Sequence, residues 1–380
     1  MKKNIFIFFL LFTACCLQLS AQWSNKTLIS GSITRSYRVY QSPNYNASLP
    51  ASLLIALHGL GDNMTNFSSI GFNFIADTAN IICIFPQAVS DPYAGTAWNS
   101  GAGSGGYYPN AGVNDINFIN ALIDTANANY SIDNSSIYLC GFSMGGFMTE
   151  RMALQSNTRI AAFASMSGTF GSGITSFSPG RHVPIAHFHG TADATVLYTG
   201  NNYGSDPDSL IHFWALNNAC NPTPTIYSYP NLVNDGISVD RYEYSNGNPQ
   251  SDVWFYKMNG AGHTVLYQPA NDISETYEIW LFLRRHRLGA SGIIDPIDFS
   301  HKILVYPNPA HEEITIVSQA CLQTKNAVVA VYNIQGQLIM QQALFHEKTE
   351  VDLHGLTKGL YYYQLSNKKG EIINGKFVKQ

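Results

Sequence analysis

Charged residues are scarce in this sequence. Asp, Glu, Lys and Arg make up 12% of its 380 residues, against about 25% in a typical soluble domain. The net charge at pH 7 is -4, and the chain contains no stripe of Lys and Arg. Proteins that bind nucleic acids need such a stripe to neutralise phosphates, so nucleic acid is excluded as a partner. Gly, Ser, Asn and Tyr supply the polar surface instead, which suits an extracellular protein.

Patterns that bind metals are also missing, because the sequence has neither a CxxC nor an HExxH motif. We therefore expect no metal site. Cysteine is sparse too, and Cys83 and Cys140 lie inside apolar segments that indicate buried strands. A free cysteine in such a position acts as a small hydrophobic side chain, so no disulfide framework is expected.

Long hydrophobic runs are absent except at the N-terminus. Two lysines precede an apolar segment at residues 5–14, and the small residues of a cleavage site end at Ala21. This order predicts a signal peptide at residues 1–21. Spanning a bilayer takes about 20 apolar residues, so we expect no transmembrane segment once the signal is removed. Residues 12–15 loosely resemble a lipoprotein processing site, which leaves lipidation at Cys15 as an alternative.

Arginine and tryptophan are absent from the last part of the chain. All nine arginines and all five tryptophans precede residue 289. The stretch Gly289-Ala290-Ser291-Gly292 begins there and is typical of a flexible linker. We therefore predict a first domain at residues 22–288, a linker at 289–302 and a second domain at 303–380.

The first domain alternates apolar segments with helical patterns, which predicts an α/β fold with a mostly parallel sheet and helices on both faces. The expected strands cover residues 53–57, 81–85, 137–140, 161–166, 185–189 and 253–258. The expected helices cover residues 113–130, 144–155, 207–216 and 272–288.

The second domain has short alternating segments separated by turn residues, which predicts a small all-β sandwich. Its expected strands cover residues 303–306, 314–317, 328–332, 338–341, 350–353, 359–365 and 372–378. It contains no convincing catalytic cluster, which indicates an accessory or anchoring module.

Gly141-Phe142-Ser143-Met144-Gly145 is a G-x-S-x-G motif between an expected strand and an expected helix. This setting is that of the nucleophile elbow in the α/β-hydrolase fold, where a tight turn leaves the serine hydroxyl exposed. The two glycines are needed because the turn leaves no room for Cβ atoms. We predict Ser143 as a nucleophile, with a glycine-rich helix start capped by Ser143 as the alternative.

A serine hydroxyl needs a base and an orienting acid. In this fold the acid and then the histidine follow the serine along the chain. Asp193 and His263 each come just after an expected strand, at the edge where open parallel sheets place their ligands. We predict Asp193 as the acid and His263 as the base.

Other residues could supply these groups. Three further aspartates lie in polar loops that no strand precedes, and three further histidines flank other elements, where structural hydrogen bonds are expected. These residues are Asp206, Asp208, Asp235, His58, His187 and His189.

Acyl transfer also needs hydrogen-bond donors aimed at the developing oxyanion. One expected donor is the backbone N–H of Met144, at the helix N-terminus. The second is expected in the loop at residues 58–63, with Leu60 favoured. The alternative is that Gly59 and Gly61 serve only a tight turn.

Three aromatic residues, Trp98, Tyr107 and Tyr108, lie in a glycine-rich loop at residues 95–112. Such side chains can stack on sugars or phenolic rings. They can equally form a small core of the loop itself, and both interpretations stay open.

Together these motifs resemble secreted esterases related to polyhydroxybutyrate depolymerases and to carbohydrate esterase family one, the feruloyl and acetylxylan esterases. The resemblance implies hydrolysis of an ester through an acyl-serine, with Ser143, Asp193 and His263 as the triad and no cofactor. The matching stretches cover residues 57–62, 85–87, 113–117, 138–147, 189–193 and 260–264.

Two features depart from this family. Relatives often have His-Thr-Trp-Pro at the base, where this chain has His263-Thr264-Val265-Leu266. Relatives also often pair a cysteine at the position of Cys220 with one before the last strand. That segment contains no cysteine here, which implies an unpaired Cys220.

The second domain resembles the sorting domain of the type IX secretion system, through the motifs at residues 305–310, 332–337 and 356–361. The resemblance implies that residues 303–380 engage the type IX secretion machinery. Export would then pass through the periplasm and end in release or cell-surface attachment. A carbohydrate-binding sandwich is the alternative.

Four functions follow, of which the last two are less expected than the first two. The first is an esterase acting on plant-wall polysaccharide esters, and the second is a polyhydroxybutyrate-type polyester depolymerase. The third is a non-catalytic surface binding protein that keeps the fold, against which the intact triad argues. The fourth is a peptidase.

Overall fold

The computed structural model describes residues 22–175, 178–247, 251–289, 303–318, 327–335, 337–344, 348–366 and 372–380. The chain divides into two compact units, Met1–Ser291 and Gly292–Gln380. The predicted signal peptide, the alternative lipidation site at Cys15 and residues 290–302 of the predicted linker lie outside the described residues. In the described part of the chain, no helix has the length and apolarity needed to cross a membrane.

A ten-stranded sheet forms the centre of the first unit, in the order β1-β2-β4-β3-β7-β8-β9-β12-β11-β10. Its six central strands are parallel, and each overlaps a strand that the apolar pattern predicts. These strands are β3 (Ala51–Leu57), β4 (Ile81–Pro86), β7 (Ile132–Phe142), β8 (Ala162–Met166), β9 (Ile185–Gly190) and β12 (Val253–Asn259). The predicted parallel α/β fold is therefore confirmed.

Four antiparallel strands extend this sheet at its two ends, and the sequence analysis did not predict them. They are β1 (Gln22–Ser30), β2 (Ile33–Gln41), β10 (Thr225–Ser228) and β11 (Ser238–Tyr244). Strands near the ends of a sheet have a solvated face and carry many polar residues, so they lack the continuous apolar run of a buried parallel strand. A further small hairpin pairs β5 (Val89–Asp91) with β6 (Gly95–Ala97).

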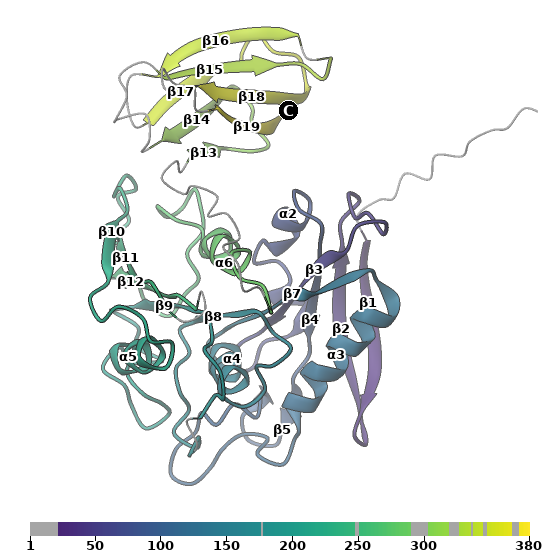
Figure 1. The fold of residues 1–380 in the computed structure, drawn as a ribbon, viewed down its shortest axis with the longest axis vertical. Coiled ribbons are helices and arrows are strands. Elements are labelled where there is room, and N and C mark those ends of the chain that lie inside the picture. The colour runs from purple at the N-terminus through teal and green to yellow at the C-terminus, as the bar shows by residue number, and fades with distance from the viewer. Residues whose placement is uncertain are drawn as a thin grey trace, which may run out of the picture. The chain divides into compact units, whose positions relative to one another are not determined.

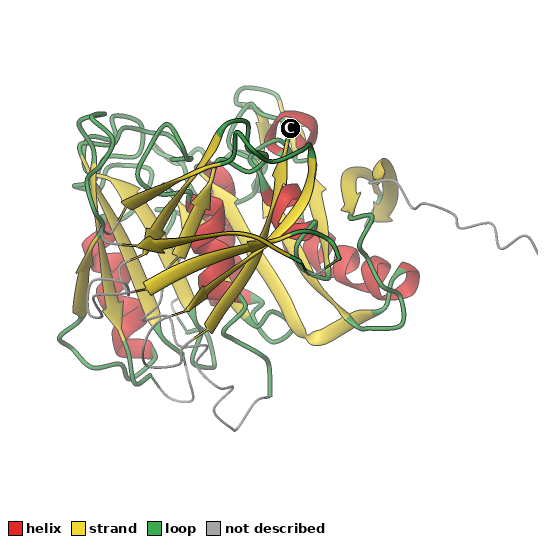
Figure 2. Cartoon of the chain, turned by 90° about the horizontal axis from the view of Figure 1, so that it is seen from above, coloured by secondary structure: helices red, strands yellow, loops and turns green. Residues whose placement is uncertain are grey.

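Helices cover both faces of the sheet, as predicted (Figure 1). One face carries α3 (Asp115–Asn129), α4 (Met144–Gln155) and α5 (Pro207–Asn217). The other face carries α1 (Met64–Phe67), α2 (Phe72–Ala76) and α6 (Glu275–Leu283). All helices in the described part of the chain belong to this unit, and they are red in Figure 2.

The last helix is shorter than the predicted 272–288. Ser274 is its N-cap and Arg284 its C-cap. Beyond it, the N–H of Leu288 donates to the carbonyl of Ser135 at 2.9 Å, which draws the chain out of the helical path.

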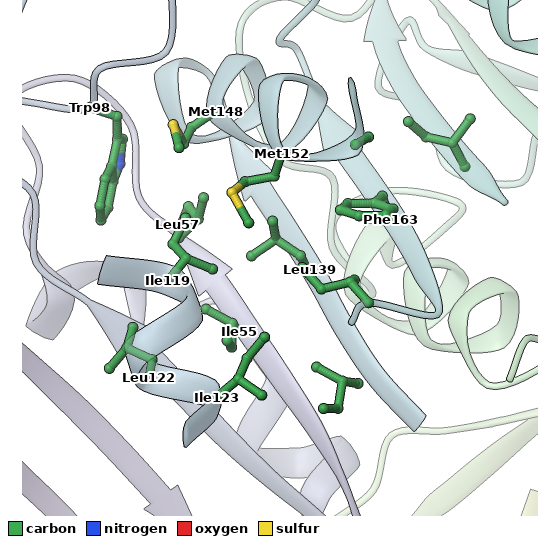
Figure 3. Close-up of a cluster of buried hydrophobic side chains, with 14 of the residues drawn as sticks. Ile55, Leu57, Trp98, Ile119, Leu122, Ile123, Leu139, Met148, Met152 and Phe163 are labelled. Carbon is green, nitrogen blue, oxygen red and sulfur yellow. The ribbon is translucent and has the colours of Figure 1, made fainter. Parts of the chain in front are cut away.

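The core beneath α3 and α4 is a continuous apolar layer (Figure 3). Ile119 from α3 and Met148 from α4 lie over Leu57 of β3 and Leu139 of β7, and all four are fully buried. Burying such side chains contributes about 1.5–3 kcal/mol each. This layer fixes α4 against the strands on either side of it, and so fixes the turn at its N-terminus.

The second unit contains two antiparallel sheets that share one apolar cluster. One sheet holds β13 (Ile303–Tyr306), β14 (Glu313–Ser318) and β17 (Lys348–Asp352). The other holds β15 (Ala327–Tyr332), β16 (Leu338–Leu344), β18 (Gly359–Ser366) and β19 (Ile372–Lys379). Buried residues of both sheets, such as Ile314 and Val329, belong to that cluster. The predicted all-β region is confirmed.

Candidate active site

Ser143 occupies a strained turn between β7 and α4. Its backbone has φ 54° and ψ −120°, a sparsely populated conformation that costs about 1–3 kcal/mol. A Cβ atom on Gly141 would overlap the carbonyl of Gly145, and one on Gly145 would overlap the carbonyl of Leu57. Only glycine fits at both positions, so the two motif glycines allow the turn that raises Ser143 out of the sheet.

Three hydrogen-bonding side chains converge at the carboxyl ends of the parallel strands. His263 Nε2 lies 2.9 Å from Ser143 Oγ, and His263 Nδ1 lies 2.7 Å from Asp193 Oδ2. Ser143 follows β7, Asp193 follows β9 and His263 follows β12, strands that lie near one another in the sheet. The structure therefore brings together all three residues that the sequence analysis selects.

Asp193 is fixed and oriented by its own loop. Its Oδ1 accepts the N–H groups of Thr195 and Val196, both at 2.8 Å, which leaves Oδ2 for His263. Burial alone would raise the pKa of Asp193, but the hydrogen bonds from His263, Val196 and Thr195 outweigh it, and the pKa is lowered. The carboxylate is therefore ionised at neutral pH, as an acid that orients an imidazole must be.

His263 packs beside Phe142, with 4.9 Å between the ring centroids. The segment after it is held by the buried carboxyl of Glu275. The N–H of Leu266 donates to Glu275 Oε1 at 2.6 Å, and the N–H of Glu275 donates back to the carbonyl of Leu266 at 3.0 Å. Burial raises the pKa of Glu275 to about 8, against the hydrogen bond from Leu266. The sequence does not predict this role for Glu275, because an acidic residue in the first helical turn ordinarily indicates an exposed charge near the helix dipole.

The loop after β3 lies directly against Ser143. A Cβ atom on Gly59 would come within 3.3 Å of Ser143 Cβ. His58 Nε2 accepts the N–H of Ala88 at 3.1 Å, so its Nδ1 carries the proton and donates to the carbonyl of Gly59 at 2.7 Å. Because a peptide is planar and trans, the N–H of Leu60 points away from that carbonyl.

Among the described residues, the N–H groups of Met144 and Leu60 meet no hydrogen-bond acceptor. The side chain of Leu60 is exposed and that of Met144 is buried, but only their backbone groups matter for this role. His58, for which structural hydrogen bonds are expected, forms them with Gly59 and Ala88. It thereby orients the Gly59–Leu60 peptide.

Trp98 cannot stack on a substrate, and that prediction is wrong. Its ring is 0% exposed and belongs to the core layer (Figure 3). Its Nε1–H donates to the carbonyl of His58 at 2.8 Å. A buried indole needs a partner for this group, and here the partner lies in the loop beside Ser143. The alternative, a small core of the loop itself, does not describe Trp98 either, because its ring belongs to the main core on the sheet.

Tyr107 and Tyr108 differ from Trp98 and from each other. The hydroxyl of Tyr107 donates to Asp91, which raises the pKa of Tyr107 to about 12 and lowers the pKa of Asp91. The ring of Tyr107 stays exposed and packs edge-on against exposed Tyr93. Tyr108 is half-buried over Gly103. Only Tyr107 presents a largely exposed ring.

The alternative acids have other roles in the structure. Asp206 caps α5 by accepting the N–H of Ser209, Asp208 accepts the hydroxyl of Tyr198, and Asp235 accepts the side-chain amide of Asn271. In the described part of the chain, no group of three or more His, Cys, Asp or Glu side chains is placed to hold a metal ion. Cys83, Cys140 and Cys220 are free thiols.

Fold and site together define the first unit as an α/β-hydrolase domain with a Ser–His–Asp arrangement at the elbow. Comparison with known families agrees. Residues 44–202 match the phospholipase/carboxylesterase family, and residues 304–380 match the secretion system C-terminal sorting domain. The sorting domain marks the chain as a secreted or cell-surface protein.

Three curated relatives resemble the first unit. A bifunctional acetylxylan esterase/xylanase of Neocallimastix patriciarum is 28% identical, over 65% of this chain and 33% of its own length. A probable feruloyl esterase C of Aspergillus oryzae is 29% identical, over 50% of this chain and 64% of its own. Poly(3-hydroxyalkanoate) depolymerase C of Paucimonas lemoignei is 23% identical, over 59% and 58%. The chain thus spans less than two thirds of each relative, and the resemblance drawn from the motifs is confirmed.

Among solved structures, the acetyl xylan esterase from Aspergillus awamori is similar with a TM-score of 0.49 and 15% identity. The similarity covers 64% of this chain and 96% of that one.

Proposed function

We propose that the protein is a secreted serine esterase that hydrolyses carboxylic esters through an acyl-enzyme at Ser143. The observation that carries the proposal is the unbroken pair of hydrogen bonds from Ser143 to His263 and from His263 to Asp193, at 2.9 and 2.7 Å. These distances are within the range required of a nucleophile and its base. The proposal assigns Ser143 as nucleophile, His263 as base and Asp193 as acid.

Acylation begins when Ser143 Oγ attacks the ester carbonyl carbon and its proton passes to His263 Nε2. The carbonyl oxygen becomes an oxyanion, and Asp193 stabilises the imidazolium that forms. The intermediate then collapses: the bond from the carbonyl carbon to the alcohol oxygen breaks, and that oxygen takes the proton from Nε2. The alcohol leaves, and the acyl group stays on Ser143.

Deacylation repeats these steps with water. His263 removes a proton from water as the water oxygen attacks the acyl carbon, and it returns that proton to Ser143 Oγ as the acid leaves. The enzyme ends in its starting state, with one ester and one water converted into one acid and one alcohol.

The oxyanion is assigned to the N–H groups of Met144 and Leu60. Both lack an acceptor among the described residues, and the loop that carries Leu60 lies against Ser143. Such a donor contributes about 3–4 kcal/mol to the transition state. Hydrogen bonds from Trp98 and His58 to this loop hold the Leu60 peptide before substrate arrives.

The proposed substrates are feruloyl or acetyl esters of plant-wall polysaccharides, since two of the similar proteins are named for such esters. Exposed apolar side chains in the loops that carry or adjoin the three catalytic residues favour a substrate with an apolar or aromatic part. They are Leu60, Leu197, Tyr203 and Tyr267, with Tyr107 in the loop after β6.

A polyester of the hydroxyalkanoate type is the second candidate, because one similar protein is named as a depolymerase of that polymer. Delivery is assigned to residues 303–380, which would be recognised by the type IX secretion machinery, as their match to a sorting domain supports.

The test is acid release by the purified protein from feruloylated arabinoxylan, acetylated xylan and short-chain polyhydroxybutyrate. Ser143→Ala is the inactive control, and Ser167→Ala is the matched control, because its buried hydroxyl meets no partner among the described residues. Ferulate or acetate release that only Ser143→Ala abolishes supports the first candidate. Hydroxybutyrate release alone supports the second candidate, and the absence of acid release from all three substrates contradicts both.

A further inference from the structure

A series of buried polar side chains leads to the loop that carries Asp193 and ends there at the carbonyl of Val196. It consists of Glu150 on α4, Ser165 on β8, and His187 and His189 on β9, and all four are 0% exposed. Burying a polar group is costly unless it is hydrogen-bonded, so each of these four side chains is expected to have hydrogen-bond partners.

The four side chains are in continuous hydrogen-bond contact. Glu150 Oε1 lies 2.5 Å from Ser165 Oγ, and Ser165 Oγ lies 2.7 Å from His187 Nδ1. His187 Nε2 lies 3.2 Å from His189 Nδ1, and His189 Nε2 lies 2.8 Å from the carbonyl oxygen of Val196.

The carbonyl of Val196 sets the direction of every proton in this chain. A carbonyl only accepts, so His189 Nε2 must carry a proton, and in a neutral ring Nδ1 then accepts. His187 Nε2 must donate to that Nδ1, which leaves His187 Nδ1 as the acceptor of the Ser165 hydroxyl proton.

Glu150 is then left with one possible state. Because the Ser165 proton points to His187, Ser165 Oγ can only accept from Glu150, and the 2.5 Å contact requires a proton on Glu150 Oε1. The other oxygen, Oε2, accepts the Nε1–H of Trp214 at 2.8 Å. With an ionised Glu150, Ser165 would donate to the carboxylate and His187 Nδ1 would have to donate to Ser165. Either His187 or His189 would then carry a second proton, which would place a carboxylate and an imidazolium in the protein interior.

We propose that Glu150 is a neutral carboxylic acid that starts a one-way hydrogen-bond relay through Ser165, His187 and His189 to Val196, and that this relay positions Asp193 for His263. Glu150, Ser165, His187 and His189 are thus positioning residues. The assignment of their effect rests on the proposed function.

The end of the relay shows how it acts on Asp193. His189 holds the carbonyl of Val196, while the N–H of Val196 donates to Asp193 Oδ1 at 2.8 Å. Val196 is therefore held through both its carbonyl and its N–H, and the N–H fixes the Asp193 carboxylate that faces His263.

The electrostatics of the chain agree with this assignment. Burial is the main influence on Glu150 and raises its pKa to about 8, while its hydrogen bonds with Ser165 and Trp214 act in the opposite direction and are outweighed. Burial also lowers the pKa of His187 and of His189, so both rings are neutral. The titratable groups that act on His189 are Asp193, His263 and Asp208, besides His187.

The first test needs no substrate. The infrared difference spectrum between the full chain and its Glu150→Gln variant at pH 6 is expected to contain the C=O stretch of a protonated carboxylic acid. The protonated Glu275 is common to both proteins and cancels. A carboxylate stretch in its place overturns the proposal, whether or not the protein hydrolyses esters.

The second test compares two Glu150 variants of similar size. In Glu150→Gln, the carboxamide can donate to Ser165 and accept from Trp214, so kcat is expected within about threefold of the wild type. In Glu150→Met, both hydrogen bonds are lost, and kcat is expected to fall about tenfold at unchanged KM. Equal kcat in the two variants, whether unchanged or reduced relative to the wild type, overturns the positioning role.

A further pair keeps the second test decisive if Glu150→Met does not fold. Ser165→Ala breaks the relay at its middle and is expected to lower kcat about tenfold at unchanged KM. Ser167→Ala removes an equally buried hydroxyl that lies outside the relay and is expected to change neither constant. Equal kcat in Ser165→Ala and Ser167→Ala overturns the proposal. A wild type without esterase activity contradicts the proposed function instead, and the infrared result still decides the state of Glu150.

Discussion

His263 Nδ1 lies 2.7 Å from Asp193 Oδ2, although 70 positions separate the two residues in the sequence. The sheet accounts for their proximity. Strands β9 and β12 are parallel neighbours, and His189 is paired with Lys257 near their carboxyl ends. Both strands therefore end at the same edge of the sheet. The sheet therefore brings Asp193 and His263 together, and the hydrogen bond between them orients the imidazole toward Ser143.

Replacing Asp193 by Asn is expected to lower kcat about 10⁴-fold, because the carboxamide favours the wrong tautomer of His263 and cannot stabilise its cation. The fold should persist, since the amide oxygen can still accept the N–H groups of Thr195 and Val196. Asp206→Asn is the matched control, because Asn caps a helix as well as Asp does. Steady-state kinetics on a soluble ester, with circular dichroism to monitor folding, check this prediction. Retained activity in Asp193→Asn would contradict the assigned acid.

The elbow predicts a difference between two glycines. Gly145→Ala is expected to destabilise the protein by about 1–3 kcal/mol and to reduce activity, because its Cβ would overlap the carbonyl of Leu57. Gly112→Ala should be close to neutral, since a Cβ there meets no atom within 4 Å. Denaturant unfolding of both variants measures the effect. Equal stability of the two would show that the turn at Ser143 is not constrained as described.

The buried carboxyl of Glu150 predicts a pH-dependent difference in stability. Its pKa is raised from the ordinary 4.5 to about 8, so between these values the folded chain keeps a proton that the unfolded chain has released. The stability that this proton contributes is fully present below pH 4.5 and is lost as the pH rises toward 8. The free energy of unfolding of the wild type, relative to Glu150→Gln, should therefore fall by up to about 1.4 kcal/mol per pH unit.

Urea unfolding of the two proteins at pH 5, 6, 7 and 8 measures this difference, and the comparison cancels the titration of every other group. Glu275, whose pKa is raised to the same value by burial, should behave alike when it is replaced by Gln. A difference that stays constant with pH would mean that Glu150 is ionised throughout.

The division into two units predicts that the first unit works alone. A chain of residues 22–288 should fold and keep kcat/KM within about threefold of the full protein, because the whole Ser143–His263–Asp193 arrangement lies within Met1–Ser291. Loss of the sorting segment should instead block delivery to the cell surface. An unfolded or inactive truncation would contradict this division.

Most of the fold follows from local sequence patterns. The six parallel strands are buried on both faces, so each contains a continuous apolar run. The G-x-S-x-G motif is equally local, because two glycines and a serine must share one turn. The strands at both ends of the sheet escape such an analysis, since their solvated faces mix polar and apolar residues, as in the half-exposed β1.

Side-chain partners across the fold are less predictable. Trp98 lies in a glycine-rich loop of the kind that often holds a substrate, yet its ring fills the core beneath α3 and α4. Glu150 lies in the middle of a helix, where glutamate is usually exposed. Only the packing of α4 on β8 reveals that it is buried against Ser165. No pattern along the chain encodes either contact.

Covalent labelling can identify the nucleophile, which is assigned to Ser143. The wild type and Ser167→Ala are incubated with a fluorophosphonate, and Ser143→Ala is treated in the same way. Mass spectrometry of the digested proteins locates the adduct. One adduct, on Ser143, is expected in the first two proteins, and none is expected in Ser143→Ala. An adduct on another residue, or an unreactive wild type, would contradict it.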